Sequence, residues 1–465
     1  MMKHIHLIGI GGTGLSAIAL LLKERGYTVS GSDRIPSRLT QQLVDQGIQV
    51  FIGHKAENIS GADLIVRSSA VPLDNPEVVT ADAAGISVLK RAEFLGELTA
   101  GSITVAIAGT HGKTTTTAMI AWALTQAGHD PSFIIGGVSK NMGVNAHAGS
   151  GSVFIIEADE YDHMFLGLAP NLAVITNLDY DHPDCFPTEE IYRDAFKQFA
   201  QKIKPDGTLL VCSDNPGADW LVASAILDQV YTLTYGIDHP ACYQAQGLKT
   251  NPIGGTDFEV VYQPKDESPL PLVTISLPIP GKHNVYNALA AVSAIHQLGF
   301  SVSASALALL EYQGTGRRFD LRGIANGVVV IDDYAHHPTE IQATLAAARQ
   351  RYPTQTIWTV WQPHTFTRLK TFSSQFSGAF SDADHVIVTD VYGAREESGN
   401  FSANQLVDEM RHPSVNFIPK LTTVSSYLLQ NLTKGDVLIV LSAGDADQVS
   451  TTVLEGLKAR EATHV

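Results

Sequence analysis

A glycine-rich segment about a quarter of the way along the chain has residues that could hold the phosphates of a nucleotide. It stands between an apolar run and a helical pattern, and it reads Gly109-Thr110-His111-Gly112-Lys113-Thr114-Thr115. In such a loop backbone amides wrap the phosphates, the lysine reaches the β and γ oxygens, and the threonine hydroxyl binds Mg²⁺. The usual pattern has its first glycine five residues before the second, whereas Gly109 lies three before Gly112. We therefore predict a shortened phosphate loop, the alternative being a glycine-rich turn with a surface lysine.

A second glycine-rich turn lies near the N-terminus. It reads Gly9-Ile10-Gly11-Gly12-Thr13-Gly14, is followed by Ser16 in a helical pattern, and fits G-x-G-x-x-G. Asp33 comes about 20 residues later, at the end of the next predicted strand, where its carboxylate could accept from a ribose hydroxyl. A tight turn without a ligand is the alternative. Because the glycine-rich turn, the helix that follows it and Asp33 all suit the same ligand, we predict that a nucleotide diphosphate binds here.

Two acidic segments could complete a metal site. Glu157-Ala158-Asp159-Glu160 and Asp179-Tyr180-Asp181-His182 each follow a predicted strand, at the carboxyl end where open α/β sheets bind ligands. Mg²⁺ prefers oxygen ligands, so Glu157 is a plausible second ligand beside Thr114, whereas His182 could instead be a hydrogen-bonding residue. Taken singly, the remaining four acids are expected to be solvated loop residues or helix caps.

Polar residues recur in the second half of the chain. Asn284, in Gly281-Lys282-His283-Asn284, could cap the following helix or bind a base edge. Arg317 and Arg318 suit phosphate, or they form a surface pair with acids of a neighbouring domain.

The segment Asp332–Glu340 carries three acids, two histidines and a tyrosine between a strand and a helix. Thr339 and Gln342 match a capping box at the start of that helix. His364 and Arg368 follow another strand of the same unit, so we expect them to meet a small polar substrate together with His336.

The elements that must position these residues alternate between strand and helix. Such alternation predicts α/β units with a mostly parallel sheet. The pattern of strand, glycine-rich turn and helix at residues 5–25 restarts at Ile103–Ala108, and a third unit begins near Gly314–Gly316. Residues 231–280 favour antiparallel or irregular β structure. A chain of 465 residues is also too long for one core.

Composition excludes several classes of protein. A net charge of −16 argues against a general nucleic-acid binder. We find no apolar run long enough to span a bilayer and no signal-peptide pattern near the N-terminus, and Cys185, Cys212 and Cys242 suggest neither a metal site nor disulfides. We expect a cytoplasmic protein without a membrane partner.

The ordered motifs resemble those of the Mur ligases of peptidoglycan synthesis, over essentially the whole chain. They are GTHGKTTTT, EADE, DYDH, GKHNVYNALAA, GTGRRFD, DDYAHHPTEI and QPHTFTRLK. The resemblance implies a Rossmann-like N-terminal domain for a UDP-sugar (1–98), a central P-loop ATPase-like domain (99–314) and a C-terminal Rossmann-like α/β domain (315–465). Among these ligases the chain most resembles those that join L-alanine to the lactyl carboxylate of UDP-N-acetylmuramate. Ligation of a murein tripeptide in peptidoglycan recycling is the nearest alternative.

The resemblance also implies cofactors and site residues. ATP would phosphorylate the carboxylate with one Mg²⁺ bound to Thr114 and Glu157 and a second served by His182. The amine would then attack the acyl phosphate in a monomer or weak homodimer. The catalytic residues would be Lys113, His182, Arg317 and His336. The ATP site would be Gly109 to Thr115 with His283, Asn284, Asn287 and Arg318. The UDP-substrate site would be Gly11, Gly12, Thr13, Gly14, Ser16, Asp33 and Ser69, and the amino-acid site Tyr334, His336, His364 and Arg368.

Two positions depart from the family pattern. Tyr161 follows the EADE motif where many of the alanine-adding relatives have serine, and tripeptide ligases also carry tyrosine there. Thr365 stands where many have a second arginine for the amino-acid carboxylate.

Two other classes of protein would need different residues. A nicotinamide-dependent dehydrogenase would have no use for Lys113 and Thr114, and a nucleotide-regulated binding protein would not need His336, His364 and Arg368.

Overall fold

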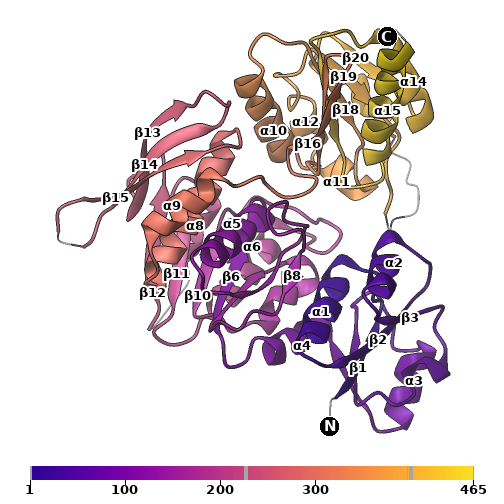
Figure 1. Ribbon diagram of the computed structural model, residues 1–465, viewed down its shortest axis with the longest axis vertical. Coiled ribbons are helices and arrows are strands. Elements are labelled where there is room, and N and C mark those ends of the chain that lie inside the picture. The colour runs from indigo at the N-terminus through magenta and orange to yellow at the C-terminus, as the bar shows by residue number, and fades with distance from the viewer. Residues whose placement is uncertain (1–2, 225–228, 266, 395, 397–401, 464–465) are drawn as a thin grey trace.

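The protein folds into three lobes, each built around its own sheet (Figure 1). The computed structural model describes residues 3–224, 229–265, 267–394, 396 and 402–463. In Figure 1 the first lobe contains the N-terminus, the second carries a projecting antiparallel ribbon, and the third contains the C-terminal helix. The α/β architecture with three units expected from the sequence is confirmed.

The first lobe is a five-stranded parallel sheet in the order β3-β2-β1-β4-β5. Its strands are β1 (His4–Ile8), β2 (Thr28–Asp33), β3 (Gln49–Ile52), β4 (Leu64–Arg67) and β5 (Ser87–Lys90). Its helices are α1 (Thr13–Glu24), α2 (Arg38–Asp45), α3 (Pro76–Ala83) and α4 (Arg91–Leu98). The strand order reverses beside β1, so the first glycine-rich turn lies at the switch point where such sheets bind ligands.

The second lobe is a ten-stranded sheet in the order β15-β14-β13-β12-β11-β10-β6-β9-β7-β8. The strands that position the phosphate loop and the acids are β6 (Ile103–Ala108), β9 (Val153–Glu157) and β10 (Leu172–Ile175). The other strands are β7 (Ser132–Ile134), β8 (Ala146–His147), β11 (Thr208–Cys212), β12 (Tyr231–Gly236), β13 (Tyr243–Thr250), β14 (Thr256–Tyr262) and β15 (Leu270–Leu277). Strands β13 to β15 pair antiparallel, which confirms that part of the prediction for 231–280, although β12 pairs parallel with β11.

Helix α5 (Lys113–Gln126) forms the centre of this lobe. It follows β6 directly, and nearly all its residues from Thr114 to Leu124 are buried. It contacts α8 (Lys282–Gln297), α9 (Val302–Leu310) and β9. A helix covered on several sides has little polar face, and the many threonines and alanines of α5 suit such close packing. The remaining helices are α6 (Glu189–Ala200) and α7 (Pro216–Ser224).

The third lobe is a six-stranded sheet in the order β16-β17-β21-β18-β19-β20. Its strands are β16 (Asp320–Ala325), β17 (Val328–Asp333), β18 (Ile357–Trp361), β19 (His385–Val388), β20 (Val415–Phe417) and β21 (Val437–Leu441). Its helices are α10 (Pro338–Arg351), α11 (Phe366–Thr371), α12 (Ser373–Phe376), α13 (Ala403–Val407), α14 (Leu421–Asn431) and α15 (Asp447–Thr463). The pairing of β16 with β17 is antiparallel and all other pairings are parallel.

The cap of α10 differs from the prediction. The capping residue is His337, whose ring accepts from the Thr339 amide, and the reciprocal partner is Glu340, whose carboxylate accepts from the His337 amide. Thr339 and Gln342 are therefore not the capping pair, because Pro338 takes the first helical position and moves the helix start forward. Among the described helices, none combines the length and the apolar character that crossing a membrane requires.

Candidate active site

The two glycines of the phosphate loop have conformations and surroundings that exclude a side chain. Gly109 and Gly112 have φ of +128° and +83°, a region that L residues with a side chain rarely adopt. A Cβ on Gly109 would collide with Thr176 Oγ1, and one on Gly112 would collide with Asn287 Oδ1. The loop therefore closes tightly against neighbouring segments, in spite of its shortened spacing.

Lys113 is held by its own loop and by a buried acid. Its Nζ donates to the carbonyls of Gly109 at 2.6 Å and Thr110 at 3.1 Å, and lies 2.8 Å from Glu160 Oε2. Burial alone would lower the pKa of Lys113, but Glu160 and the neighbouring acids outweigh burial and raise it. Glu160 is fully buried, so the expectation of a solvated loop acid is wrong for this residue.

Thr114 and Glu157 are adjacent, and their oxygens suit a magnesium ion. Thr114 Oγ1 lies 3.0 Å from Glu157 Oε1, and Glu157 Oε2 accepts from the Gly136 amide at 2.7 Å. Adjacent ligands of a Mg²⁺ octahedron are about 2.9 Å apart, so the two oxygens have a suitable separation. Burial raises the pKa of Glu157, and a cation would offset the cost of its buried charge. Within the described residues, no group of three or more His, Cys, Asp and Glu side chains is arranged to hold a metal ion.

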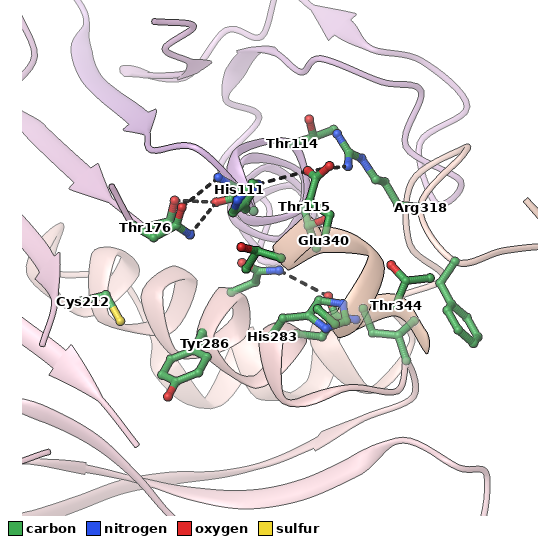
Figure 2. A pocket seen from close by; sticks show the side chains of 18 of the residues that line it. His111, Thr114, Thr115, Thr176, Cys212, His283, Tyr286, Arg318, Glu340 and Thr344 are labelled. Carbon is green, nitrogen blue, oxygen red and sulfur yellow. Dashed lines mark hydrogen bonds and ion pairs between the residues drawn. The ribbon is translucent and has the colours of Figure 1, made fainter. Parts of the chain in front are cut away.

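A cavity of about 270 Å³ opens between the heads of α5, α8 and α10 (Figure 2). We call it the smaller cavity, and the predicted nucleotide residues that line it are His111, Gly112, Thr114, Thr115, His283, Asn284, Asn287 and Arg318. Burial lowers the pKa of His283 to about 4, so this ring is neutral. Asn284 does not cap α8, since Gly281 is the capping residue and the side-chain Nδ2 of Asn284 donates to the Pro280 carbonyl.

An ion-pair network joins the phosphate loop to the third lobe. His111 lies 3.4 Å from Asp179 and 3.2 Å from Glu340, and Arg318 lies 3.6 Å from Glu340. Figure 2 shows Arg318 and His111 reaching Glu340 from different segments. Burial by itself would lower the pKa of His111, but the two carboxylates outweigh burial and raise it to about 9. His111 is therefore a cation that links two lobes at neutral pH.

A second cavity, of about 540 Å³, is lined by all three lobes. We call it the larger cavity. The first lobe contributes Gly12, Thr13, Gly14 and Ser69, the second contributes Thr110, Lys113, Thr114, Glu157 and His182, and the third contributes Arg318, Tyr334, His336, His364 and Arg368. The structure thus brings together residues that the sequence placed in separate subsites.

Three predicted UDP-substrate residues do not line this cavity. Asp33 Oδ2 accepts from the Gly11 amide at 2.8 Å, so this carboxylate closes the glycine-rich turn from behind. A Cβ on Gly11 would press on the same carboxylate. Ser16 is buried and donates to the Thr13 carbonyl at 3.0 Å. Asp33, Gly11 and Ser16 therefore shape the turn, whereas Gly12, Thr13 and Gly14 face the cavity.

Arg91 faces the larger cavity although no motif marks it. It begins α4, and its guanidinium lies so close to Gly14 that a Cβ there would collide with it. Its Nη2 lies 3.7 Å from Asp159, and its Nε contacts the Met164 sulfur. Its position after β5, beside the first glycine-rich turn, is the only sequence signal that could have found it.

The third lobe separates its two adjacent arginines. Arg317 Nη2 donates to the carbonyls of Ser442 at 2.7 Å and Gly444 at 3.1 Å, and Arg317 lines neither the smaller nor the larger cavity. Arg318 lines both cavities. The reaction role that the resemblance implies for Arg317 therefore fits Arg318 better, because the Arg317 guanidinium is already bonded within the third lobe.

His336 and His364 of the third lobe are neutral and partly buried. Burial lowers the pKa of His336 to about 3 and that of His364 to about 4. His336 Nδ1 lies 2.9 Å from the Tyr334 carbonyl. A carbonyl only accepts, so Nδ1 carries the proton and Nε2 is left as an acceptor. Both rings line the larger cavity.

Comparisons with known proteins agree with this arrangement. Residues 4–102 match the Mur ligase family, catalytic domain; residues 107–295 match the Mur ligase middle domain; and residues 317–444 match the Mur ligase, glutamate ligase domain. The chain is 42% identical to a UDP-N-acetylmuramate–L-alanine ligase from Syntrophus aciditrophicus, over 99% of this chain and 94% of that protein. It is 41% identical to the protein of the same name from Alkaliphilus metalliredigens, over 97% of each.

Two solved structures have the same three-lobed fold. The UDP-N-acetylmuramate-alanine ligase MurC from Thermotoga maritima superposes with a TM-score of 0.81 at 28% identity, covering 100% of both chains. A murein peptide ligase from Psychrobacter arcticus superposes with a TM-score of 0.72 at 26% identity, covering 98% of this chain and 99% of that one. With all three domains matched in order and full-length relatives above 40% identity, this chain belongs to the Mur ligase family.

Proposed function

We propose that this protein uses ATP to join L-alanine to the lactyl carboxylate of UDP-N-acetylmuramate. The observation that carries the proposal is the larger cavity, where the first glycine-rich turn, the phosphate loop and the histidines of the third lobe face one space. The full-length relatives named above support alanine over a murein tripeptide as the amine donor. We further propose residues 1–98, 99–314 and 315–465 as the UDP-sugar, ATP and amino-acid domains.

In the proposed first step, a lactyl carboxylate oxygen bonds to the γ-phosphorus of ATP and ADP leaves. The smaller cavity would hold the adenine beside His283, Asn284 and Asn287, with the phosphates on the loop from Gly109 to Thr115. Lys113 would leave its loop carbonyls to meet the β and γ oxygens, and Arg318 would approach from the opposite side. Positioning and charge neutralisation account for most catalysis of this reaction.

Mg²⁺ would be held by Thr114 and Glu157, and a second Mg²⁺ would be served by His182, which lines the same cavity. When bound, the ion neutralises charge on the transferring phosphoryl group. Glu160 would remain as the buried partner of Lys113 and keep its ammonium within reach of the loop.

In the second step the amine nitrogen bonds to the acyl carbon, inorganic phosphate leaves and the amine loses a proton. His336 Nε2 is the acceptor that the structure offers for this proton, because Nδ1 donates to the Tyr334 carbonyl. Arg368 would hold the amino-acid carboxylate, with Tyr334 and His364 beside it.

One assay tests the function. The protein is incubated with ATP, Mg²⁺ and UDP-N-acetylmuramate, and phosphate release is measured after adding L-alanine, glycine, L-serine or the tripeptide singly. We expect release with L-alanine. Phosphate release with the tripeptide alone would show that the protein catalyses the recycling reaction instead of alanine addition. No release with any donor, together with oxidation of NADH in the presence of a hydroxy acid, would overturn the ligase itself.

A further inference from the structure

Asp181 is a buried carboxylate that bonds to two lobes at once. It follows β10 in the second lobe and is 4% exposed. Its Oδ1 accepts from Arg368 Nε of the third lobe at 2.8 Å and from the backbone amide of His182 at 2.7 Å. Arg368 is itself only 2% exposed. The expectation that Asp181 is a solvated acid or helix cap is therefore wrong.

The contact with Asp181 leaves Arg368 little freedom. Besides the Nε bond to Asp181, Nη1 lies 2.9 Å from His364 Nδ1 and Nη2 lies 3.4 Å from His182 Nδ1. A guanidinium is planar, so fixing Nε and Nη1 also fixes the direction of Nη2. Asp181 supplies the only carboxylate hydrogen bond to Arg368 among the described residues.

The second contact acts on the backbone. His182 has φ of +53°, which is strained for a residue with a side chain. The Asp181 carboxylate accepts from the amide of this residue. Strain of this kind persists only where the surroundings determine the conformation, and it gathers at functional sites. One carboxylate thus sets the His182 backbone and the Arg368 side chain, and both residues line the larger cavity.

We propose that Asp181 is a positioning residue that aligns Arg368 for the carboxylate of the incoming amine donor. This inference rests on the proposed function, because it takes Arg368 as the group that meets that carboxylate. Asp181 also lines the larger cavity, but its Oδ1 is already used by Arg368 and by the His182 amide. Through it, the amino-acid subsite of the third lobe is aligned by a residue of the second lobe.

The test compares Asp181→Asn with a control at another contact between the same two lobes. Lys140 Nζ lies 2.6 Å from Asp320 of the third lobe, and Lys140 does not line the larger cavity. We expect D181N to raise the KM for L-alanine about 10- to 100-fold, the usual effect of removing a residue that orients a ligand-binding group. The KM for ATP and the activity of Lys140→Met should be nearly unchanged. An unchanged KM for L-alanine in D181N, or an equal rise in K140M, would overturn the proposal.

A double variant separates positioning from general loss of structure. If Asp181 acts through Arg368, adding D181N to Arg368→Met should raise the KM for L-alanine no further than R368M alone. The double variant also removes both buried charges, so it should fold even if D181N by itself does not. Additive increases in KM would show that Asp181 acts on something other than Arg368.

A measurement without turnover keeps this proposal distinct from the proposed function. If the unchanged protein uses the tripeptide, the same variants are compared with that donor. If it uses neither donor, the function fails, and hydrogen exchange of α11 (Phe366–Thr371) still tests the contact. D181N should speed exchange in α11 and K140M should not. Equal exchange in the two variants would contradict the positioning role.

Discussion

The two glycine-rich turns share the same order of strand, turn and helix but differ in the side chains that surround them. Each follows a parallel strand and opens a helix. The first turn is closed from behind by Asp33 and faces one cavity together with Arg91. The second faces both cavities, carries a lysine bonded to its own carbonyls, and is reached by Glu340 of the third lobe. A strand, a tight turn and a helix therefore provide an anion site, whereas the side chains brought from elsewhere decide what is done there.

Among the changes to the two turns, removal of Lys113 from the second turn should have the largest effect on activity. We expect Lys113→Ala to lower the ligation rate about 10²- to 10³-fold, because a preorganised charge on the transferring group is lost. Binding of UDP-N-acetylmuramate, measured by calorimetry, should stay nearly unchanged. Because K113A leaves Glu160 buried without its ion-pair partner, the matched variant is K113A with Glu160→Gln. It should recover thermal stability and remain inactive. Recovery of activity in that variant would show that Lys113 has only a structural role.

Adding one methyl group to each turn should sharpen the comparison. Gly112→Ala would place a side chain at φ of +83° and against Asn287. We expect kcat/KM for ATP to fall about tenfold or more from the backbone strain alone. Gly14→Ala meets only the movable end of Arg91, so it should raise the KM for UDP-N-acetylmuramate a few-fold (about 1 kcal/mol or less) and leave ATP unaffected. Steady-state kinetics with each substrate varied in turn gives both results, and a reversed pattern would exchange the two assignments.

Substitution of Arg91 tests whether the first turn also depends on a charged side chain from another segment for substrate binding. We expect Arg91→Ala to raise the KM for UDP-N-acetylmuramate about tenfold, the value of one hydrogen bond to a charged group, without changing the KM for ATP. Arg25 provides the control, since it donates to the Leu98 carbonyl in the same lobe at 2.9 Å and does not line the larger cavity. If Arg25→Ala has the same effect on the KM, the loss of Arg91 acts through the lobe as a whole.

The smallest effect should come from His111 and depend on pH. Its pKa is raised from 6.5 to about 9 by Asp179 and Glu340, and its ring also lies 4.9 Å from that of His337. A raised pKa stabilises the fold fully below pH 6.5, and this contribution is lost as pH rises through about 9. We expect His111→Gln to lower the melting temperature by about 2–4 °C at pH 6, with the difference vanishing near pH 9.5. A difference independent of pH would show that the ring only packs.

Sequence alone predicted the elements better than the contacts between lobes. The buried strand Ile103–Ala108 lies where its apolar run predicted it, because a strand covered on both faces has an unbroken apolar pattern. The burial of Asp181 depends on Arg368, 187 residues away, and no local pattern reports such a partner. The same holds for Arg91, whose role comes from the lobe it faces.

The adjacent arginines and the α10 cap show a second limit. Arg317 and Arg318 are equivalent as sequence, and only the carbonyls of Ser442 and Gly444 separate their roles. At the start of α10, the general propensity of threonine favours Thr339 as the cap. The structure uses His337 and Glu340 instead, because Pro338 takes the first helical position. Glu340 also pairs with His111 and Arg318 of the site, and no local pattern reports these contacts.

The smaller and larger cavities share Thr114, Arg318 and Glu340 in their linings. The two chambers are therefore separated by a partition only a few side chains thick. A single molecule that crossed this partition would occupy both chambers but lose translational freedom only once. After one end had bound, the other end would be held at a high effective concentration near its own chamber, and this would raise the affinity of the whole molecule. Because the partition is thin, a substitution there that conferred resistance to such a compound would also alter the lining of both chambers. The partition is thus the part of the molecule where tight inhibition and enzyme function depend on the same few atoms.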